Sequence, residues 1–329
     1  MDISEVLRNK VVDLKNKKIL VSNLLASNQS NDLTMPPNCN GFGRIRHFRM
    51  HKSDRWLTDP LPNIPYATRM NIPVEETLQT QLFQISACNF RCWFCFVDDA
   101  LLSANEAHSK FLSIEELFEL YLAEPIQPKL IVLSGGHPYL APEWLLWTIQ
   151  KIQELKRDDL YVWTDDNLSN YYYWKYLSDN QRKYISNFYH QGRVGCFKGF
   201  DEESFMYNTK ASASHFNQQF EVFDRIFKEG VDLYAYAIFT TAQSTNIKNK
   251  VSRFVDRLQT IHNNLPLRTI PLEIIPYTPV VKREKTNDSQ ALNVQYQVLE
   301  CWNEELEKRF SFEERNLLIS NVTMTPHER

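Results

Sequence analysis

Short apolar runs alternate with longer stretches of helical periodicity from about residue 78 onward. The short runs predict strands at 82–86, 130–133, 160–164, 193–197, 231–240 and 272–275. The stretches between and after them predict helices at 114–123, 142–155, 215–229, 247–262 and 290–310, with further helical, tyrosine-rich sequence after 164. Strands that alternate with helices in this way predict an α/β fold, a parallel sheet with right-handed crossovers. Such a sheet is either open or curled into a partial (β/α)6 parallel barrel.

The first part of the chain has a different pattern. Apolar residues at helical spacing predict an amphipathic helix over 1–30, and polar, basic and proline-punctuated stretches follow it. We therefore expect three parts. Residues 1–77 form an N-terminal extension, 78–285 form the core, and 286–329 form a C-terminal helical segment.

Composition narrows the class of protein. The 329 residues are 43% hydrophobic and 23% charged, which is typical of a globular chain with a sizeable core. The net charge of −3 argues against a wholesale basic nucleic-acid binder. Neither a long apolar run nor a signal-peptide pattern occurs, so we expect a soluble cytoplasmic protein with no membrane association.

The cysteines give the strongest chemical signal. Cys88, Cys92 and Cys95 have the spacing CxxxCxxC directly after the first predicted strand, and the other three cysteines are widely separated. A short loop can wrap three thiolates around a soft metal centre. On a 4Fe–4S cluster three cysteines leave one iron open to a small molecule. A structural zinc site would need a fourth nearby ligand, and His108 fits that role poorly.

This motif, with Phe94 just before the third cysteine, resembles that of the radical S-adenosylmethionine (SAM) superfamily over roughly 78–280. The resemblance implies that Cys88, Cys92 and Cys95 bind one 4Fe–4S cluster and that Phe94 borders the adenine of SAM. It also implies that an electron donor such as flavodoxin or ferredoxin reduces the cluster. SAM is then cleaved to a 5′-deoxyadenosyl radical, which abstracts hydrogen from a substrate.

The end of the second predicted strand carries Gly135 and Gly136 in a chain with only 8 glycines. Two adjacent glycines let a backbone approach a ligand closely, although they also suit an ordinary turn. By resemblance they match the glycine-rich motif that holds the amino group of SAM. His137 stands where that motif usually has an acidic residue, so its own role stays open.

The ends of the later predicted strands carry further residues that are candidate ligand contacts. Asp166, Asn167 and Ser169 follow the third strand and suit a ribose or amino-acid head group, or they cap the next helix. Lys198 follows the fourth strand and is either a surface side chain or a cation for a ligand carboxylate. It resembles the lysine that contacts the SAM carboxylate in glycyl-radical-activating enzymes. Ile275, at the sixth strand, is by resemblance an adenine contact.

The substrate stays open. The segment 44–55 carries five basic side chains against one acidic one. It is either a solvated edge strand or a clamp for phosphate, and the candidate substrates are a small, possibly phosphorylated molecule, a nucleic-acid component or a partner protein. The alternative function is a non-catalytic iron–sulfur or zinc protein that senses redox state or metal.

Overall fold

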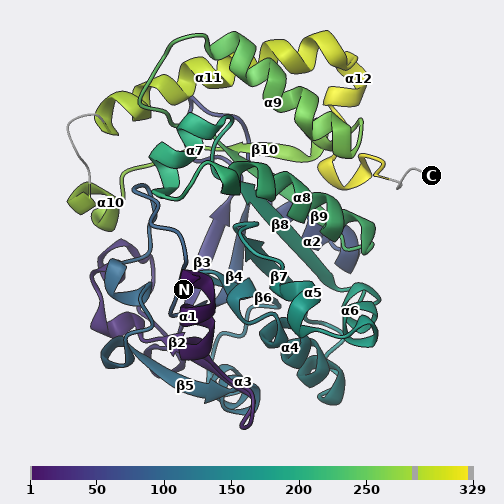
Figure 1. Cartoon of the computed structure of the whole chain (residues 1–329). Helices are drawn as coiled ribbons and strands as arrows, with labels where there is room; N and C mark the ends of the chain where they lie inside the picture. The colour runs from purple at the N-terminus through teal and green to yellow at the C-terminus, as the bar shows by residue number, and fades with distance from the viewer. Residues whose placement is uncertain (1, 284–287, 325–329) are drawn as a thin grey trace.

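A computed structural model describes residues 2–283 and 288–324, which form helices packed on a ten-stranded mixed sheet (Figure 1). Its parallel strands are adjacent in chain order: β4 (Thr77–Ile85), β6 (Leu130–Gly135), β7 (Tyr161–Asp166), β8 (Gln191–Phe197), β9 (Leu233–Ile238) and β10 (Thr269–Leu272). The predicted α/β class, with parallel strands joined by helices, is confirmed. The sheet is open, since β10 pairs only with β9 within the described ranges.

The helices follow the strands as the periodicity predicts. The principal ones are α3 (Ile114–Ala123), α4 (Glu143–Glu154), α5 (Tyr172–Tyr176), α6 (Asp179–Ser186), α8 (Ser214–Lys228), α9 (Ile247–Ile261) and α11 (Asp288–Arg309). Shorter elements that the pattern did not predict are α2 (Asn63–Met70), α7 (Glu202–Thr209), α10 (Thr278–Arg283) and α12 (Phe312–Arg315). In Figure 1, α9 and α11 lie together at the top and α4 to α6 lie at the lower right. The expected boundary at 285/286 lies outside the described residues.

The inner face of the sheet forms the floor of the site. Leu82, Val132, Trp163, Val194 and Tyr234 lie on five neighbouring strands and belong to one buried cluster. Because side chains alternate along a strand, the next inward positions toward the carboxyl ends are two residues further on. A cavity begins there.

The predicted helix over 1–30 is wrong beyond residue 11. The chain forms α1 (Ile3–Val11), β1 (Val12–Asp13) and β2 (Lys18–Ser22). The Asp13 carboxylate accepts hydrogen bonds from the backbone N–H of Asn16 (3.1 Å) and its side-chain amide (2.6 Å), which favours a turn over a helix. β2 then pairs with β5 (Ser109–Ser113), a long-range contact that local periodicity does not encode.

The sixth parallel strand was predicted at 272–275 but lies at Thr269–Leu272. After Leu272 the backbone pairs with a side chain instead of a strand. Gln295 on α11 accepts from the Ile274 N–H (3.0 Å) and donates to the Ile274 carbonyl (3.1 Å). The amide of Gln295 therefore takes the place of the next backbone pairing.

The gap between β4 and β10 is spanned by the segment that begins with β3 (Gly43–Arg49). β3 pairs antiparallel with β4, and the chain then crosses toward β10. Trp56 Nε1 donates to the Pro271 carbonyl (2.9 Å), and Ser53 Oγ donates to Glu273 (2.9 Å). Side-chain hydrogen bonds therefore link the segment after β3 to β10 and the residues that follow it. Within the described part of the chain, no helix is long and apolar enough to cross a membrane.

Candidate functional site

A cavity of about 490 Å³ opens at the carboxyl ends of the parallel strands, a size typical of small-molecule sites. Its lining includes nearly all the predicted site residues: Cys88, Cys92, Phe94, Cys95, Gly135, Gly136, Asp166, Asn167, Lys198 and Ile275. Ser169 is the exception and lies behind the wall. These residues come from separate strand ends, and the fold gathers them around one space.

The cysteine loop is fixed by buried aromatic residues and by backbone hydrogen bonds. Phe90 and Trp93 are buried, and Cys88, Cys92 and Cys95 in the same loop are half-buried at the cavity wall. Trp93 Nε1 donates to Asn208 Oδ1 (3.1 Å), and the Cys88 N–H donates to the Leu102 carbonyl (3.0 Å). The spacing of aromatic and cysteine residues therefore presents the three thiols on one side.

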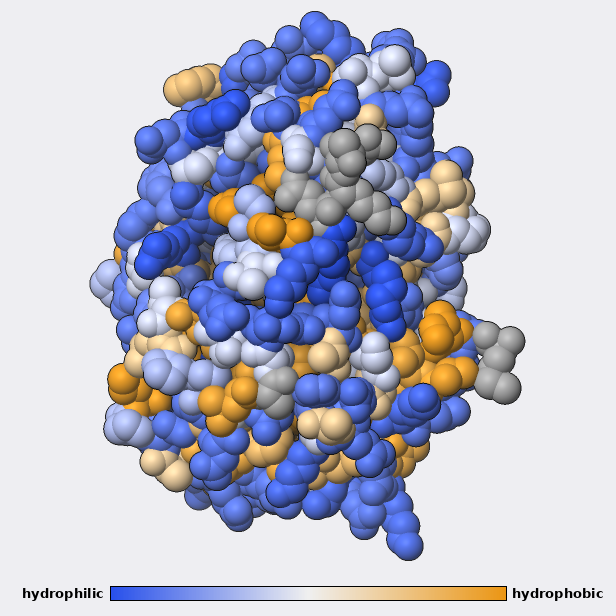
Figure 2. Space-filling model, turned by 90° about the vertical axis from the view of Figure 1, so that its left-hand side faces the viewer, coloured by the Kyte–Doolittle hydropathy of each residue, from blue (hydrophilic) through white to orange (hydrophobic). Residues whose placement is uncertain are grey.

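Two short helical elements cover this loop. Arg283 of α10 donates to the carbonyl oxygens of Cys95 and Val97. Thr278, at the start of α10, donates from Oγ1 to Asp32 (2.9 Å) of the 3₁₀ helix η2 (Asn28–Asp32). Figure 2 views the molecule from the side on which α10 lies, and hydrophobic side chains are scattered there in small groups among hydrophilic ones.

The arrangement of the three thiols bears on the kind of metal group that they could hold. No group of three or more histidine, cysteine or acidic side chains among the described residues is arranged to hold one metal ion. A 4Fe–4S cluster has several irons, so its thiolates need not converge on one point. Burial raises the pKa of Cys88 and Cys92, so metal binding would have to displace their protons. The donor set and the adjoining space fit a three-cysteine cluster with a small-molecule ligand.

The two glycines are required by backbone proximity. A Cβ atom at Gly136 would lie 1.8 Å from the Ala87 carbonyl oxygen, and Gly135 has φ +94°. The Gly136 N–H donates to the Ile85 carbonyl (3.1 Å), and the His137 N–H donates to the Ala87 carbonyl (2.7 Å). The end of β6 is thus bonded directly to the segment that leads into the cysteine loop.

His137 supports the site from behind. Its side chain is 1% exposed, and its Nε2 lies 2.9 Å from Asn170 Nδ2 and 3.9 Å from Asp166 Oδ1. Burial lowers the pKa of His137 to about 4, so the ring is neutral at pH 7. It does not line the cavity, and it occupies its position as a buried hydrogen-bonding residue.

Two adjacent aspartates at the end of β7 point to opposite faces. The Asp166 carboxylate forms a buried ion pair with Arg193 and accepts from the Leu168 N–H (2.7 Å). The Asp165 carboxylate accepts a hydrogen bond from Ser134 Oγ, and Ser134 and Asp165 both line the cavity. Sequence reasoning favoured Asp166 and passed over Asp165. Strand alternation counted inward from Trp163 identifies Asp165 as the inward-facing carboxylate.

Asn167 and Ser169 brace the cysteine loop. Asn167 Nδ2 lies 3.7 Å from Cys88 Sγ and donates to Asn89 Oδ1 (3.0 Å). Asn89 in turn donates to Ser169 Oγ (2.7 Å). Asn167 therefore reaches a predicted cluster ligand directly, whereas Ser169 acts only through Asn89.

Lys198 projects from the end of β8. Its backbone N–H donates to Gln219 Oε1 (3.1 Å), and its carbonyl accepts from Asn208 Nδ2 (2.9 Å). The ammonium group lies 5.9 Å from the centre of the Phe94 ring and lines the cavity. Of the two readings of Lys198, the inward cation agrees with this placement.

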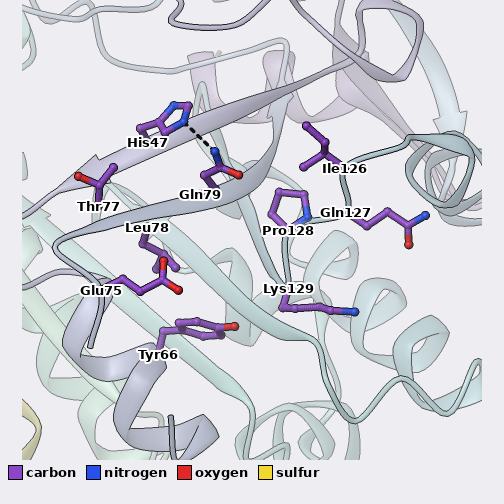
Figure 3. Close-up of a pocket in the computed structure, with 10 residues that line it drawn as sticks. All are labelled: His47, Tyr66, Glu75, Thr77, Leu78, Gln79, Ile126, Gln127, Pro128 and Lys129. Carbon is purple, nitrogen blue, oxygen red and sulfur yellow. Dashed lines mark hydrogen bonds between the residues drawn. The ribbon is translucent and has the colours of Figure 1, made fainter. Parts of the chain in front are cut away.

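A second hollow, of about 450 Å³, lies at the opposite ends of the strands, near the starts of β4 and β6 (Figure 3). His47 and Gln79 are hydrogen-bonded on its wall (3.2 Å), and Lys129 lies across from them. It contains none of the predicted site residues, so we assign it no part in the chemistry.

No protein-family model and no curated protein matches the chain. Solved structures of radical SAM enzymes do match it. They include Streptococcus suis SuiB bound to the precursor peptide SuiA, with 13% identity, a TM-score of 0.49, and coverage of 69% of this chain and 46% of SuiB. They also include anSMEcpe with bound AdoMet and Cp18Cys peptide, with 13% identity, a TM-score of 0.41, and coverage of 60% of this chain and 51% of anSMEcpe. The matches thus span about half the length of these proteins.

Proposed function

We propose that this chain is a radical SAM enzyme with a partial (β/α)6 barrel core. In this proposal Cys88, Cys92 and Cys95 hold a 4Fe–4S cluster, which when bound supplies the electron that cleaves SAM. Cleavage of SAM there would supply a 5′-deoxyadenosyl radical able to abstract hydrogen from a substrate. The observation that carries the proposal is the convergence of the CxxxCxxC thiols, the glycine pair and polar groups from β7 and β8 on one cavity.

The remaining lining residues suit the parts of SAM. Phe94 and Ile275 offer apolar surface for adenine, and the backbone at Gly135 and Gly136 is exposed to the amino group. Asp165 and Asn167 offer hydrogen bonds to ribose hydroxyls or the amino group. Lys198 offers a cation to the carboxylate, in a cavity where charge interactions are stronger than in water.

The same convergence favours an enzyme over a metal or redox sensor. A sensor requires the cysteines but has no need of Gly135, Asp165 and Lys198 from three further strand ends around them. A small flavodoxin or ferredoxin is the proposed electron donor, and the cytoplasm is the proposed location.

The test is 5′-deoxyadenosine formation by anaerobically reconstituted protein given SAM and dithionite. Wild type should release 5′-deoxyadenosine, and Cys88→Ala, Cys92→Ala and Cys95→Ala should each abolish the release. Cys301→Ala is the matched control, because Cys301 lies on α11 outside the cavity. If substrate gates cleavage, SAM should still alter the electron paramagnetic resonance spectrum of the cluster. An iron-loaded wild type with neither response would refute the proposal.

A further inference from the structure

Two arginines of β3, Arg44 and Arg46, line the same cavity as Lys198. Arg44 and Arg46 face the same way on the strand and are paired in register with Leu82 and Thr80 of β4. The Arg44 residue is only 8% exposed. The segment 44–55, for which the sequence predicted either a phosphate clamp or a solvated edge strand, therefore places a buried cation inside the molecule.

The Arg44 guanidinium has no acidic partner among the described residues. Its side chain makes no hydrogen bond or ion pair with them, and its Nε is a buried donor without an acceptor. Burial, with Arg46 adding to it, lowers the pKa of Arg44 to about 9. An unpaired buried cation is costly, and natural proteins keep such groups mainly where a ligand completes them.

Among the described residues, no carboxylate that lines the cavity forms an ion pair with either arginine, and the inward-facing Asp165 accepts from Ser134 Oγ. Lys52 is paired with Asp59 (2.9 Å), and the carboxylates of Asp32 and Asp166 are bound to Thr278 and Arg193. Glu273 accepts from Ser53 Oγ (2.9 Å) and from Tyr296 OH (3.0 Å). Each of these carboxylates already has its own donors.

Both guanidinium groups lie beside one ring of the cysteine loop. The Cζ atoms of Arg44 and Arg46 are 5.4 Å and 5.6 Å from the centre of the Phe96 ring, and Phe96 directly follows Cys95. Arg46 is also stacked on Phe48 (3.9 Å). The aromatic rings orient the two guanidinium groups without forming hydrogen bonds to their N–H groups. These donors therefore stay available to an anion.

We propose that Arg44 and Arg46 bind an oxyanion of the substrate, a carboxylate or a phosphate. The inference rests on the proposed function, because it assigns the second ligand of the same cavity. The backbone of Arg44 is in register with Leu82, and its guanidinium reaches Phe96 beside the cysteine loop. The proposed anion would therefore lie between β3 and the cysteine loop, within the same cavity.

The test uses reconstituted protein with inorganic phosphate and acetate as probes, at ionic strength matched with potassium chloride. Wild type should show a saturable rise in Tm of roughly 2–4 °C with one of the two anions at about ten times its Kd. Arg44→Met and Arg46→Met should each lose that rise, and Arg44→Met should have an unchanged or higher Tm without anion, because it removes an unpaired buried charge. Which anion acts distinguishes a phosphorylated substrate from a carboxylate.

Arg253→Met is the matched control, because Arg253 is exposed on α9 and has no ion pair among residues 2–283 and 288–324. It should keep the full anion response.

S-adenosylhomocysteine affinity, measured by calorimetry, should change less than about threefold in Arg44→Met. A wild type without a saturable response, or an arginine variant that keeps it, would overturn the inference. So would a tenfold loss of S-adenosylhomocysteine affinity in Arg44→Met, which would assign the arginine to SAM. Absence of both SAM cleavage and a SAM-dependent change in the cluster spectrum, with an intact anion response, would instead refute only the proposed function.

Discussion

Gly136 and Ala87 approach so closely that a Cβ atom on the glycine would lie 1.8 Å from the alanine carbonyl oxygen and 2.4 Å from its carbonyl carbon. The contact joins the end of β6 to the residue before Cys88. Because both partners are backbone, a side chain at position 136 cannot be accommodated by a rotamer change. The position of the cysteine loop therefore depends on this glycine.

Gly136→Ala should destabilise the fold by about 1–3 kcal/mol, the usual cost of overpacking, and should lower the iron content after reconstitution. The matched control is Gly230→Ala, since Gly230 has φ +78° but no atom within 4 Å of an added Cβ. It should lose stability through backbone strain alone and retain its iron. Thermal denaturation and iron analysis measure both effects. Equal iron contents in the two variants would contradict the role assigned to Gly136.

Asp165 and Asp166 should behave differently although they are adjacent. Asp166→Asn leaves Arg193 buried without its counter-charge, so we expect a loss of about 3–5 kcal/mol in unfolding free energy. Asp165→Asn removes a carboxylate from the cavity wall and should leave stability nearly unchanged while weakening SAM binding by roughly tenfold. Chemical denaturation and calorimetry distinguish the two. The reverse pattern would show that the inward-facing aspartate has been misassigned.

His137 should make stability pH-dependent. Its pKa is lowered from 6.5 to about 4 in the folded chain, so the unfolded chain binds the proton first as pH falls. Its contribution to stability is therefore complete above pH 6.5 and declines toward pH 4. Between pH 7.5 and 5.5 we expect the lowered pKa of His137 to reduce the free energy of unfolding by about 1 kcal/mol, which corresponds to a fall of roughly 2 °C in Tm. His137→Gln retains a polar group near Asn170 and should lose less stability over this interval than wild type. Identical pH profiles would contradict the assignment.

Asn167 should tune the cluster through Cys88. An N–H near a ligating sulfur stabilises the more negative, reduced state, so its removal lowers the reduction potential. For Asn167→Ala we expect a fall of up to roughly 40 mV, which corresponds to a hydrogen bond of about 1 kcal/mol in a one-electron couple. Ser169→Ala is the control, since Ser169 reaches the loop only through Asn89. Potentiometric titration should show little change for it, and an equal fall in both variants would indicate a general loosening of the loop.

Local sequence was informative wherever local chemistry decides structure. The helix predicted at 114–123 has those bounds in the structure, because Ser113 and Glu116 form a capping box whose two hydrogen bonds lie within one turn. The presence of parallel strands joined by helices followed from the alternation. The hairpin at Asp13 and the shifted end of β10 were missed, because β2 pairs with distant β5 and Gln295 reaches Ile274 from another helix.

The site shows the same division. CxxxCxxC and the glycine pair are contiguous in sequence, and they could be found without a structure. The choice between Asp165 and Asp166 needed the strand's facing direction, which Trp163 could have supplied. The burial of Arg44 was hidden, because a strand with alternating arginines has the same pattern whether its charged face meets solvent or a cavity.

The wall between β3 and β10 is held by side chains such as Trp56 and Ser53, while the rest of the barrel-like core is held by backbone ladders. Replacing these side chains would change the width of the cavity without removing a strand pairing. On this flank the width of the cavity therefore depends on side chains, whereas at the strand ends the backbone pairing fixes the spacing.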